Sequence, residues 1–106
     1  MKATIRQGEG NCYDVHGRMV TEENCDMILC HGSVWHDKVG WHGHCWLEDG
    51  DKVIDVSNGN NFYDSKEKYY KLGKVKNVTR YTWREAAEQM LKTGHYGPWE
   101  EDDRNK

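Results

Sequence analysis

The chain has 106 residues, of which 36% are hydrophobic and 31% are charged, so it can form one domain with a small core. Its formal net charge is −3, and the absence of a basic run argues against a nucleic-acid surface. No apolar stretch approaches the roughly 20 residues that a membrane-spanning helix needs, and the N-terminal residues lack the apolar segment of a signal peptide. We therefore expect a cytoplasmic protein with no membrane and no nucleic-acid partner.

The first predicted element is a helix over residues 12–20, preceded by Asn11, which is a favourable N-cap residue. Gly17 lowers the helix propensity of this segment. A turn or short helical piece is expected at residues 21–24. The face that repeats at helical spacing consists of Cys12, Val15, His16 and Met19.

Strands dominate the middle of the chain. Two of them, 41–48 and 52–57, are joined by Asp49-Gly50, a strong hairpin signal. The remaining elements are expected, in chain order, as a strand at 27–35, a loop at 57–64, a short helix at 64–72 and a strand at 75–82.

The last predicted element is a helix that begins after Thr82 and ends at Gly94. Thr82 and Glu85 form a capping box, and a glycine commonly ends a helix in this way. Residues 95–99 are expected to pack back on the sheet, with a place at the rim of the cleft as the alternative. The predicted apolar stripe of the helix consists of Trp83, Ala86, Ala87, Met90 and Leu91.

These elements predict an α+β fold in a single domain over residues 1–99. An N-terminal helix that carries a cysteine packs on a small antiparallel sheet, and a C-terminal helix completes the domain. The acidic residues 100–106 are expected to form a frayed tail. In a reducing compartment the four cysteines are expected to be free thiols; they are Cys12, Cys25, Cys30 and Cys45.

The register of the hairpin brings a histidine and an aspartate together. With Asp49 and Gly50 in the turn, His44 lies directly opposite Asp55, with Cβ atoms roughly 4.5–5.5 Å apart. A carboxylate beside a histidine fixes its tautomer and favours its protonated form, as a catalytic base requires. Alternation places His42, His44, Trp46, Val53, Asp55 and Ser57 on one face, and the more apolar Trp41, Cys45, Leu47, Ile54 and Val56 on the other.

Cys12 lies at the first turn of the predicted N-terminal helix, after a glycine-containing loop. Unpaired backbone N–H groups and the positive end of the helix dipole stabilise a thiolate there. The same N–H groups can donate to an oxyanion on a bound carbonyl. A small buried cysteine is the ordinary alternative, but the chain order of cysteine, histidine and aspartate favours a thiol nucleophile.

Two stretches, "GNCYD" and "GHCWLEDGDKVIDVSNG", together resemble the papain-like cysteine enzymes of the transglutaminase-like type. In that family a cysteine begins a helix, a histidine leads a strand of the form His-Ala-Trp-Val-Glu, and an aspartate ends the next strand. The resemblance implies that Cys12 is the nucleophile, His44 the general base and Asp55 the orienting acid. Two departures are Cys45 in place of alanine and the lack of a second lobe to define a cleft.

The resemblance covers residues 10–20 and 40–59, about a third of the chain. The later "RYTWREAAEQMLKTGHYGPW" is similar to a group of small phage and bacterial proteins built around the same hairpin. Papain-like enzymes often use a glutamine shortly before the cysteine as an oxyanion donor, which implies this role for Gln7. The spacing is one residue short, and a surface position for Gln7 is equally compatible. Trp46 shares the face of His44 and is expected to wall the site.

Two other classes of function remain open. His42 and His44 share a strand face and are two potential zinc ligands, with Cys30, His31 and His36 nearby in the sequence. This signal is weak, because there is no Cys-x-x-Cys pair and Cys45 points away from His44. A catalytically silent binding or inhibitor protein on the same scaffold is the other alternative.

The residues and the resemblance together favour a thiol-dependent hydrolase or acyltransferase. The expected reaction is attack on an amide or isopeptide carbonyl of a protein or peptide substrate, without a cofactor. Hydrolysis and acyl transfer use the same triad, so the sequence leaves the choice between them open, together with the oligomeric state.

Overall fold

An antiparallel five-stranded sheet separates two layers of helices in the computed structural model, which describes residues 12–22, 26–38, 40–56 and 61–99. The sheet has the strand order β4-β3-β2-β1-β5. The strands are β1 (Ile28–His36), β2 (Gly40–Asp49), β3 (Lys52–Asp55), β4 (Phe62–Ser65) and β5 (Lys76–Tyr81). The helices are α1 (Cys12–Glu22), α2 (Lys66–Gly73) and α3 (Trp83–Thr93). The predicted α+β class is confirmed, with a cysteine-bearing first helix and a helix that follows the last strand.

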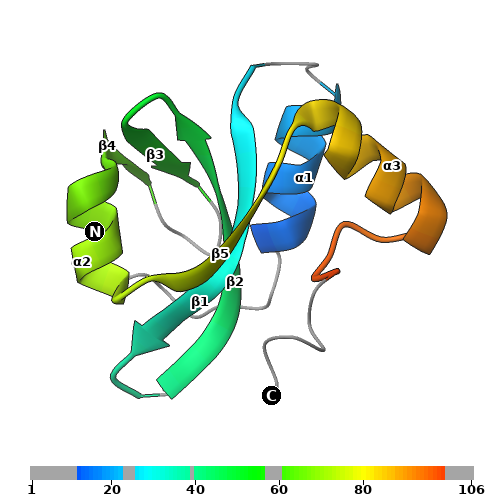
Figure 1. Ribbon diagram of the computed structural model, residues 1–106. Coiled ribbons are helices and arrows are strands. Elements are labelled where there is room, and N and C mark those ends of the chain that lie inside the picture. Colours follow the sequence, from blue (N-terminus) through cyan, green and yellow to red (C-terminus); the bar gives the residue numbers. More distant parts are fainter. Residues whose placement is uncertain (1–11, 23–25, 39, 57–60, 100–106) are drawn as a thin grey trace.

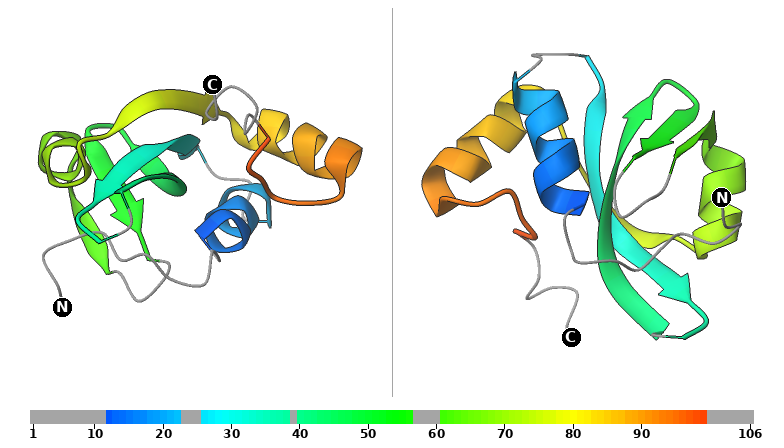
Figure 2. Two further views of the ribbon diagram at one scale, coloured as in Figure 1. Left: turned by 90° about the horizontal axis from the view of Figure 1, so that it is seen from below. Right: turned by 180° about the vertical axis from the view of Figure 1, so that it is seen from behind.

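Helices α1 and α3 lie on one side of the sheet, and α2 lies on the other (Figure 1). The two views of Figure 2 show the same division. Each side has its own hydrophobic cluster, and alternation along β2 divides its residues between them. Cys45 and Leu47 face α1 and α3, whereas Trp46 faces α2. None of the helices in the described ranges is long and apolar enough to span a membrane.

The turn of the β2–β3 hairpin lies one residue later than predicted. The facing pairs are Asp49↔Lys52, Glu48↔Val53 and Leu47↔Ile54, so Gly50 and Asp51 form the turn. Gly50 has a φ of +63°, and a two-residue turn with glycine first accommodates this conformation. The predicted pairing of His44 directly opposite Asp55 is therefore wrong by two residues. Because the shift is even, every side chain keeps its predicted face.

Strand β4 was not predicted from the sequence. The segment 57–64 reads as a loop because it is rich in Asn and Gly, and residues 57–60 lie outside the described ranges. Residues Phe62–Ser65 nevertheless pair with β3, with Asp55 opposite Phe62. Ser65 then caps α2, since its Oγ accepts a hydrogen bond from the Lys68 N–H at 3.2 Å. Pairing with β3 thus overrides the local preference of this segment.

Helix α3 has the predicted ends but a narrower apolar face. Thr82 and Glu85 form the capping box, and Gly94 ends the helix with a φ of +81°. Of the predicted stripe, only Ala86 is fully buried, and Leu91 is 79% exposed. The prediction that Leu91 packs in the core is wrong, because α3 extends past the sheet (Figure 1).

Helix α1 is packed closely at two glycines, against Tyr96 after α3 and against Gly43 on β2. A Cβ at Gly17 would lie 2.5 Å from the Tyr96 ring, and one at Gly43 would lie 2.8 Å from the Tyr13 hydroxyl oxygen. The buried face of α1 is therefore rotated slightly from the predicted one, which contained Val15 and Met19 but neither Tyr13 nor Gly17. The buried residues are Cys12, Tyr13, His16, Gly17 and Val20.

Candidate functional site

The imidazole of His44 contacts both other members of the predicted triad. Its Nε2 lies 2.9 Å from Oδ2 of Asp55, and the neighbouring Cys12 side chain is one of the groups that raise the pKa of its ring. The three side chains are almost completely buried, with 3%, 1% and 0% exposure for Cys12, His44 and Asp55.

Three different elements supply these residues. Strands β2 and β3 no longer pair at the level of His44 and Asp55. Cys12 is the first residue of α1, where the free backbone N–H groups of a helix lie. The ladder between β2 and β3 ends at Leu47↔Ile54, so His44 on β2 and Asp55 at the end of β3 are diagonal neighbours on one face. Diagonal positions remain within reach of long side chains.

The electrostatics of the site favour a charged His44–Asp55 pair. Burial by itself would lower the pKa of His44, but the hydrogen bond with Asp55 and the interaction with Cys12 raise this pKa from 6.5 to about 10. Burial by itself would raise the pKa of Asp55, but the hydrogen bond and charge of His44 lower it from 3.8 to about 2. Both shifts have the direction expected for opposite charges in contact.

Asp55 has a second buried donor from α2. The Tyr69 hydroxyl donates to Oδ2 of Asp55 at 2.6 Å, so this oxygen accepts from both Tyr69 and His44. Burial and the neighbouring Asp55 charge raise the pKa of Tyr69, which stays a neutral donor. No local signal in the sequence identifies Tyr69, because its contact depends on how α2 packs against the sheet.

His16 links the helix to the end of β3. Its Nδ1 donates to the Cys12 carbonyl oxygen at 3.0 Å, and its Nε2 accepts from the Val56 N–H at 3.1 Å. Burial lowers the pKa of His16 from 6.5 to about 4, so the ring is neutral and its tautomer is fixed by the two bonds. The sequence places His16 on the same helical face as Cys12 but assigns it no role. The signal for its role is the spacing of four residues from Cys12 on one helical face.

Trp46 lies against His44 but is not an exposed wall of the site. The two rings are stacked with centroids 6.2 Å apart and an interplanar angle of 27°, and Trp46 has 0% exposure. Its ring also packs on Tyr69. Trp46 therefore supports the His44 ring from within the core.

The other predicted candidates take no part in the His44–Asp55 hydrogen bond. Gln7 lies outside the described residues, so its predicted role as oxyanion donor stays a prediction. Cys45 faces the α1 side of the sheet and is buried with Cys12 in one cluster. His42 is adjacent, with its ring centroid 6.2 Å from that of His44. Within residues 12–22, 26–38, 40–56 and 61–99, no three His, Cys, Asp or Glu side chains are arranged to hold a metal ion.

Comparison with protein-family models, curated proteins and solved structures finds no match to this chain. The functional proposal therefore depends on the contacts of Cys12, His44 and Asp55 themselves.

Proposed function

We propose that this chain is a papain-like thiol enzyme that acts on an amide or isopeptide carbonyl. The observation that carries the proposal is the position of His44, whose Nε2 binds the Asp55 carboxylate at 2.9 Å and whose pKa is raised by both Asp55 and the neighbouring Cys12 side chain. A nucleophile, a base and a group that orients the base are the minimum set for thiol catalysis. Cys12 also begins an 11-residue helix, whose N-terminal N–H groups favour negative charge.

The proposed reaction has two steps. The Cys12 sulfur, as a thiolate paired with protonated His44, attacks the carbonyl carbon, and the carbonyl oxygen becomes an oxyanion near the start of α1. The C–N bond then breaks, His44 gives its proton to the leaving amine, and a thioester forms on Cys12. Water or a second amine attacks the thioester, His44 accepts the proton of this nucleophile, and the Cys12 thiolate leaves.

Asp55 and His16 have distinct roles in this scheme. Asp55 accepts from Nε2 of His44, which stabilises the imidazolium and, in this scheme, leaves Nδ1 to exchange the proton with the sulfur. His16 binds the Cys12 carbonyl and the Val56 N–H, so it fixes the helix start against the strand that carries Asp55. The proposed substrate is an intracellular protein or peptide.

The direct test is alkylation of each cysteine by iodoacetamide across pH 5–10, followed by mass spectrometry, in wild type and in His44→Ala. We expect Cys12 to react rapidly below pH 7 in wild type and to lose this reactivity in the variant. Cys30 is the internal control, because burial and the nearby Glu48 charge raise the pKa of its thiol. His95→Ala, at an exposed histidine, is the matched control and should label like wild type.

Slow labelling of Cys12, with a pH midpoint near about 8.5 in both proteins, would contradict the proposal, since that is the value of a free thiol. A catalytically silent binding protein is then the better assignment. The near-complete burial of Cys12, His44 and Asp55 is the observation that favours this second candidate. Under it, Cys12→Ala would retain partner binding, whereas an enzyme would lose turnover.

A further inference from the structure

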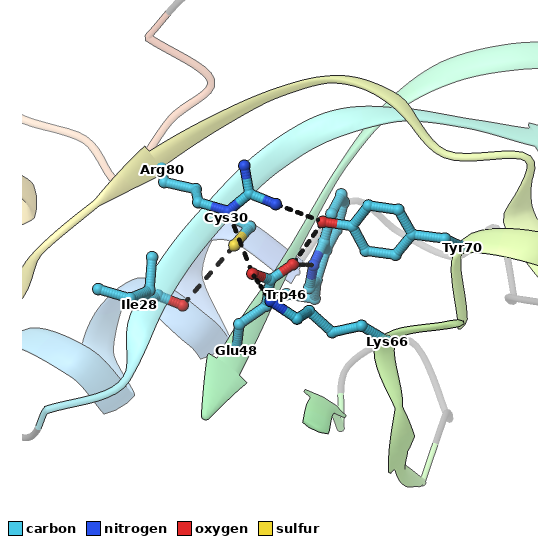
Figure 3. Close-up of polar contacts among 7 residues, drawn as sticks. All are labelled: Ile28, Cys30, Trp46, Glu48, Lys66, Tyr70 and Arg80. Carbon is cyan, nitrogen blue, oxygen red and sulfur yellow. Dashed lines mark hydrogen bonds and ion pairs between the residues drawn. The ribbon is translucent and has the colours of Figure 1, made fainter. Parts of the chain in front are cut away.

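A second buried carboxylate lies on the same side of the sheet as His44. Glu48 is 4% exposed, and its Oε2 accepts from Nε1–H of Trp46 at 3.2 Å and from the Tyr70 hydroxyl. Its Oε1 lies 3.2 Å from Nε of Arg80 and 3.6 Å from Nζ of Lys66. Figure 3 shows these donors around the carboxylate, together with a hydrogen bond from Arg80 to the Tyr70 hydroxyl.

The Glu48 carboxylate is charged at neutral pH. Burial by itself would raise its pKa, but the hydrogen bonds from Tyr70, Trp46 and Arg80 lower it. A buried charge with several donors fixes the geometry of those donors, because each would lose a charge-assisted hydrogen bond by moving. Glu48 therefore joins β2, β5 and α2 at one point.

Two short paths lead from Glu48 to the proposed triad. On the first, the indole N–H of Trp46 binds Glu48 while the indole ring stacks on His44 at an interplanar angle of 27°. On the second, Tyr70 binds Glu48 while its neighbour Tyr69 on the same helix donates to Asp55. The Glu48 carboxylate thus restrains Trp46, which stacks on His44. It also restrains the helix that carries Tyr69, the donor to Asp55.

We propose that Glu48 is a positioning residue that holds the His44–Asp55 pair in its reactive geometry through Trp46 and α2. The inference deepens the proposed thiol chemistry and rests on it for its biological meaning. Supporting groups of this kind matter because a displacement of about 1 Å at a reacting group can cost on the order of a hundredfold in rate.

The test uses two variants that break the same cluster but change its charge in opposite senses. Glu48→Gln removes a negative charge, and Arg80→Gln removes a positive charge from a side chain that is 48% exposed. If only charge mattered, the first variant would lower the pKa of His44 and the second would raise it. If position matters, both variants weaken the His44–Asp55 contact, and both lower the pKa of His44.

The readout is the pH midpoint of the His44 ring resonances by NMR, assigned with His44→Ala. We expect both variants to lower this midpoint by about one unit, a tenfold change in the protonation equilibrium. Glu67→Gln is the control, because Glu67 lies on the same helix and is 80% exposed; it should leave the midpoint unchanged. The charged or titratable groups around His44 are the same in all variants. They are Cys12, His16, His42 and Asp55, together with Tyr69, which binds Asp55.

Cys12 alkylation at pH 6, measured in parallel, should slow by about tenfold in both variants, within the range expected for a partial displacement. Opposite midpoint shifts, or no shift in either folded variant, would overturn the inference. Should Glu48→Gln not fold, Tyr70→Phe replaces it, because it removes only one hydroxyl from the cluster. Wild-type Cys12 that labels slowly and independently of His44 would refute the proposed function alone, since the NMR midpoint reports on His44 without catalysis.

Discussion

His16 and Asp55 lie 3.8 Å apart, measured from Nε2 to Oδ1, and neither side chain is exposed, yet the imidazole is neutral. The reason is that burial lowers the pKa of His16 to about 4, and Nε2, which accepts the Val56 N–H, carries no proton to offer the carboxylate. The two histidines around Asp55 therefore differ in charge: His44 is protonated and His16 is not. One carboxylate thus has one charged and one neutral imidazole beside it.

This arrangement predicts that the free energy of unfolding falls at acid pH, as His16 becomes protonated. The pKa of His16 is about 4 in the folded state and 6.5 in the unfolded state, so the unfolded chain binds more protons between these values. Stability therefore rises with pH from 4 to 6.5, by about 3 kcal/mol over the full window. The corresponding windows of Asp55, 2–3.8, and of His44, 6.5–10, do not overlap with it.

Urea unfolding of wild type and His16→Gln at pH 4.5 and 6.5 tests the assignment. Wild type should lose about 2 kcal/mol at the lower pH, and His16→Gln should lose much less because it has no imidazole to protonate. His95→Gln, at an exposed histidine, is the control and should behave like wild type. An equal loss of unfolding free energy in His16→Gln would mean that another group causes the destabilisation at acid pH.

Replacement of Asp55 should affect stability and reactivity together. Asp55→Asn removes the charge that holds the proton on His44, and breaking a buried pair in this way costs about 3–5 kcal/mol. Burial then lowers the pKa of His44, so we expect Cys12 alkylation at pH 6 to slow by about tenfold or more. Asp49→Asn, an exposed change on β2, should alter the unfolding free energy by less than about 0.5 kcal/mol. Rapid Cys12 labelling in folded Asp55→Asn would show that the carboxylate does not activate the site.

The contact between His44 and Asp55 illustrates what the sequence determines. Alternation along a strand fixes the face of each side chain, and this survived an error of two residues in the register. The predicted register places both Asp49 and Gly50 in the turn, whereas Gly50 occupies its first position and Asp51 its second. The face on which a side chain lies is thus predictable from the local sequence. Whether His44 lies directly opposite Asp55 or diagonal to it depends on the turn.

The remaining parts of the site depend on contacts between distant segments. Tyr69 reaches Asp55 only because β4 pairs with β3 and leads directly into α2, and β4 itself was predicted to be a loop. His16 was placed on the same helical face as Cys12, but its acceptor role needs Val56, 40 residues later in the chain. Such long-range pairing leaves no periodic signal in a single sequence.

The Tyr69 hydroxyl should contribute measurably to stability. Tyr69→Phe removes one of the donors to a buried carboxylate oxygen, and an unmade hydrogen bond to a charged group costs about 1.5–3 kcal/mol. We expect the free energy of unfolding in urea at pH 7 to fall by about this amount. Tyr63→Phe is the control, since Tyr63 is 64% exposed and its hydroxyl has little to lose. Equal stabilities for the two variants would indicate that water replaces the hydroxyl at Asp55.

Gly17 offers a case in which two known effects have opposite signs. Alanine in a helix interior is favoured over glycine by about 1 kcal/mol, but a Cβ at this position would lie 2.5 Å from Cδ1 of Tyr96. Overpacking of this kind costs about 1–3 kcal/mol, so we expect Gly17→Ala to destabilise the protein. The effect should reverse in a Tyr96→Ala background, where the clash is gone and only the propensity gain remains. A double-mutant cycle of unfolding free energies measures this coupling; additive values would mean that α1 is not seated against Tyr96.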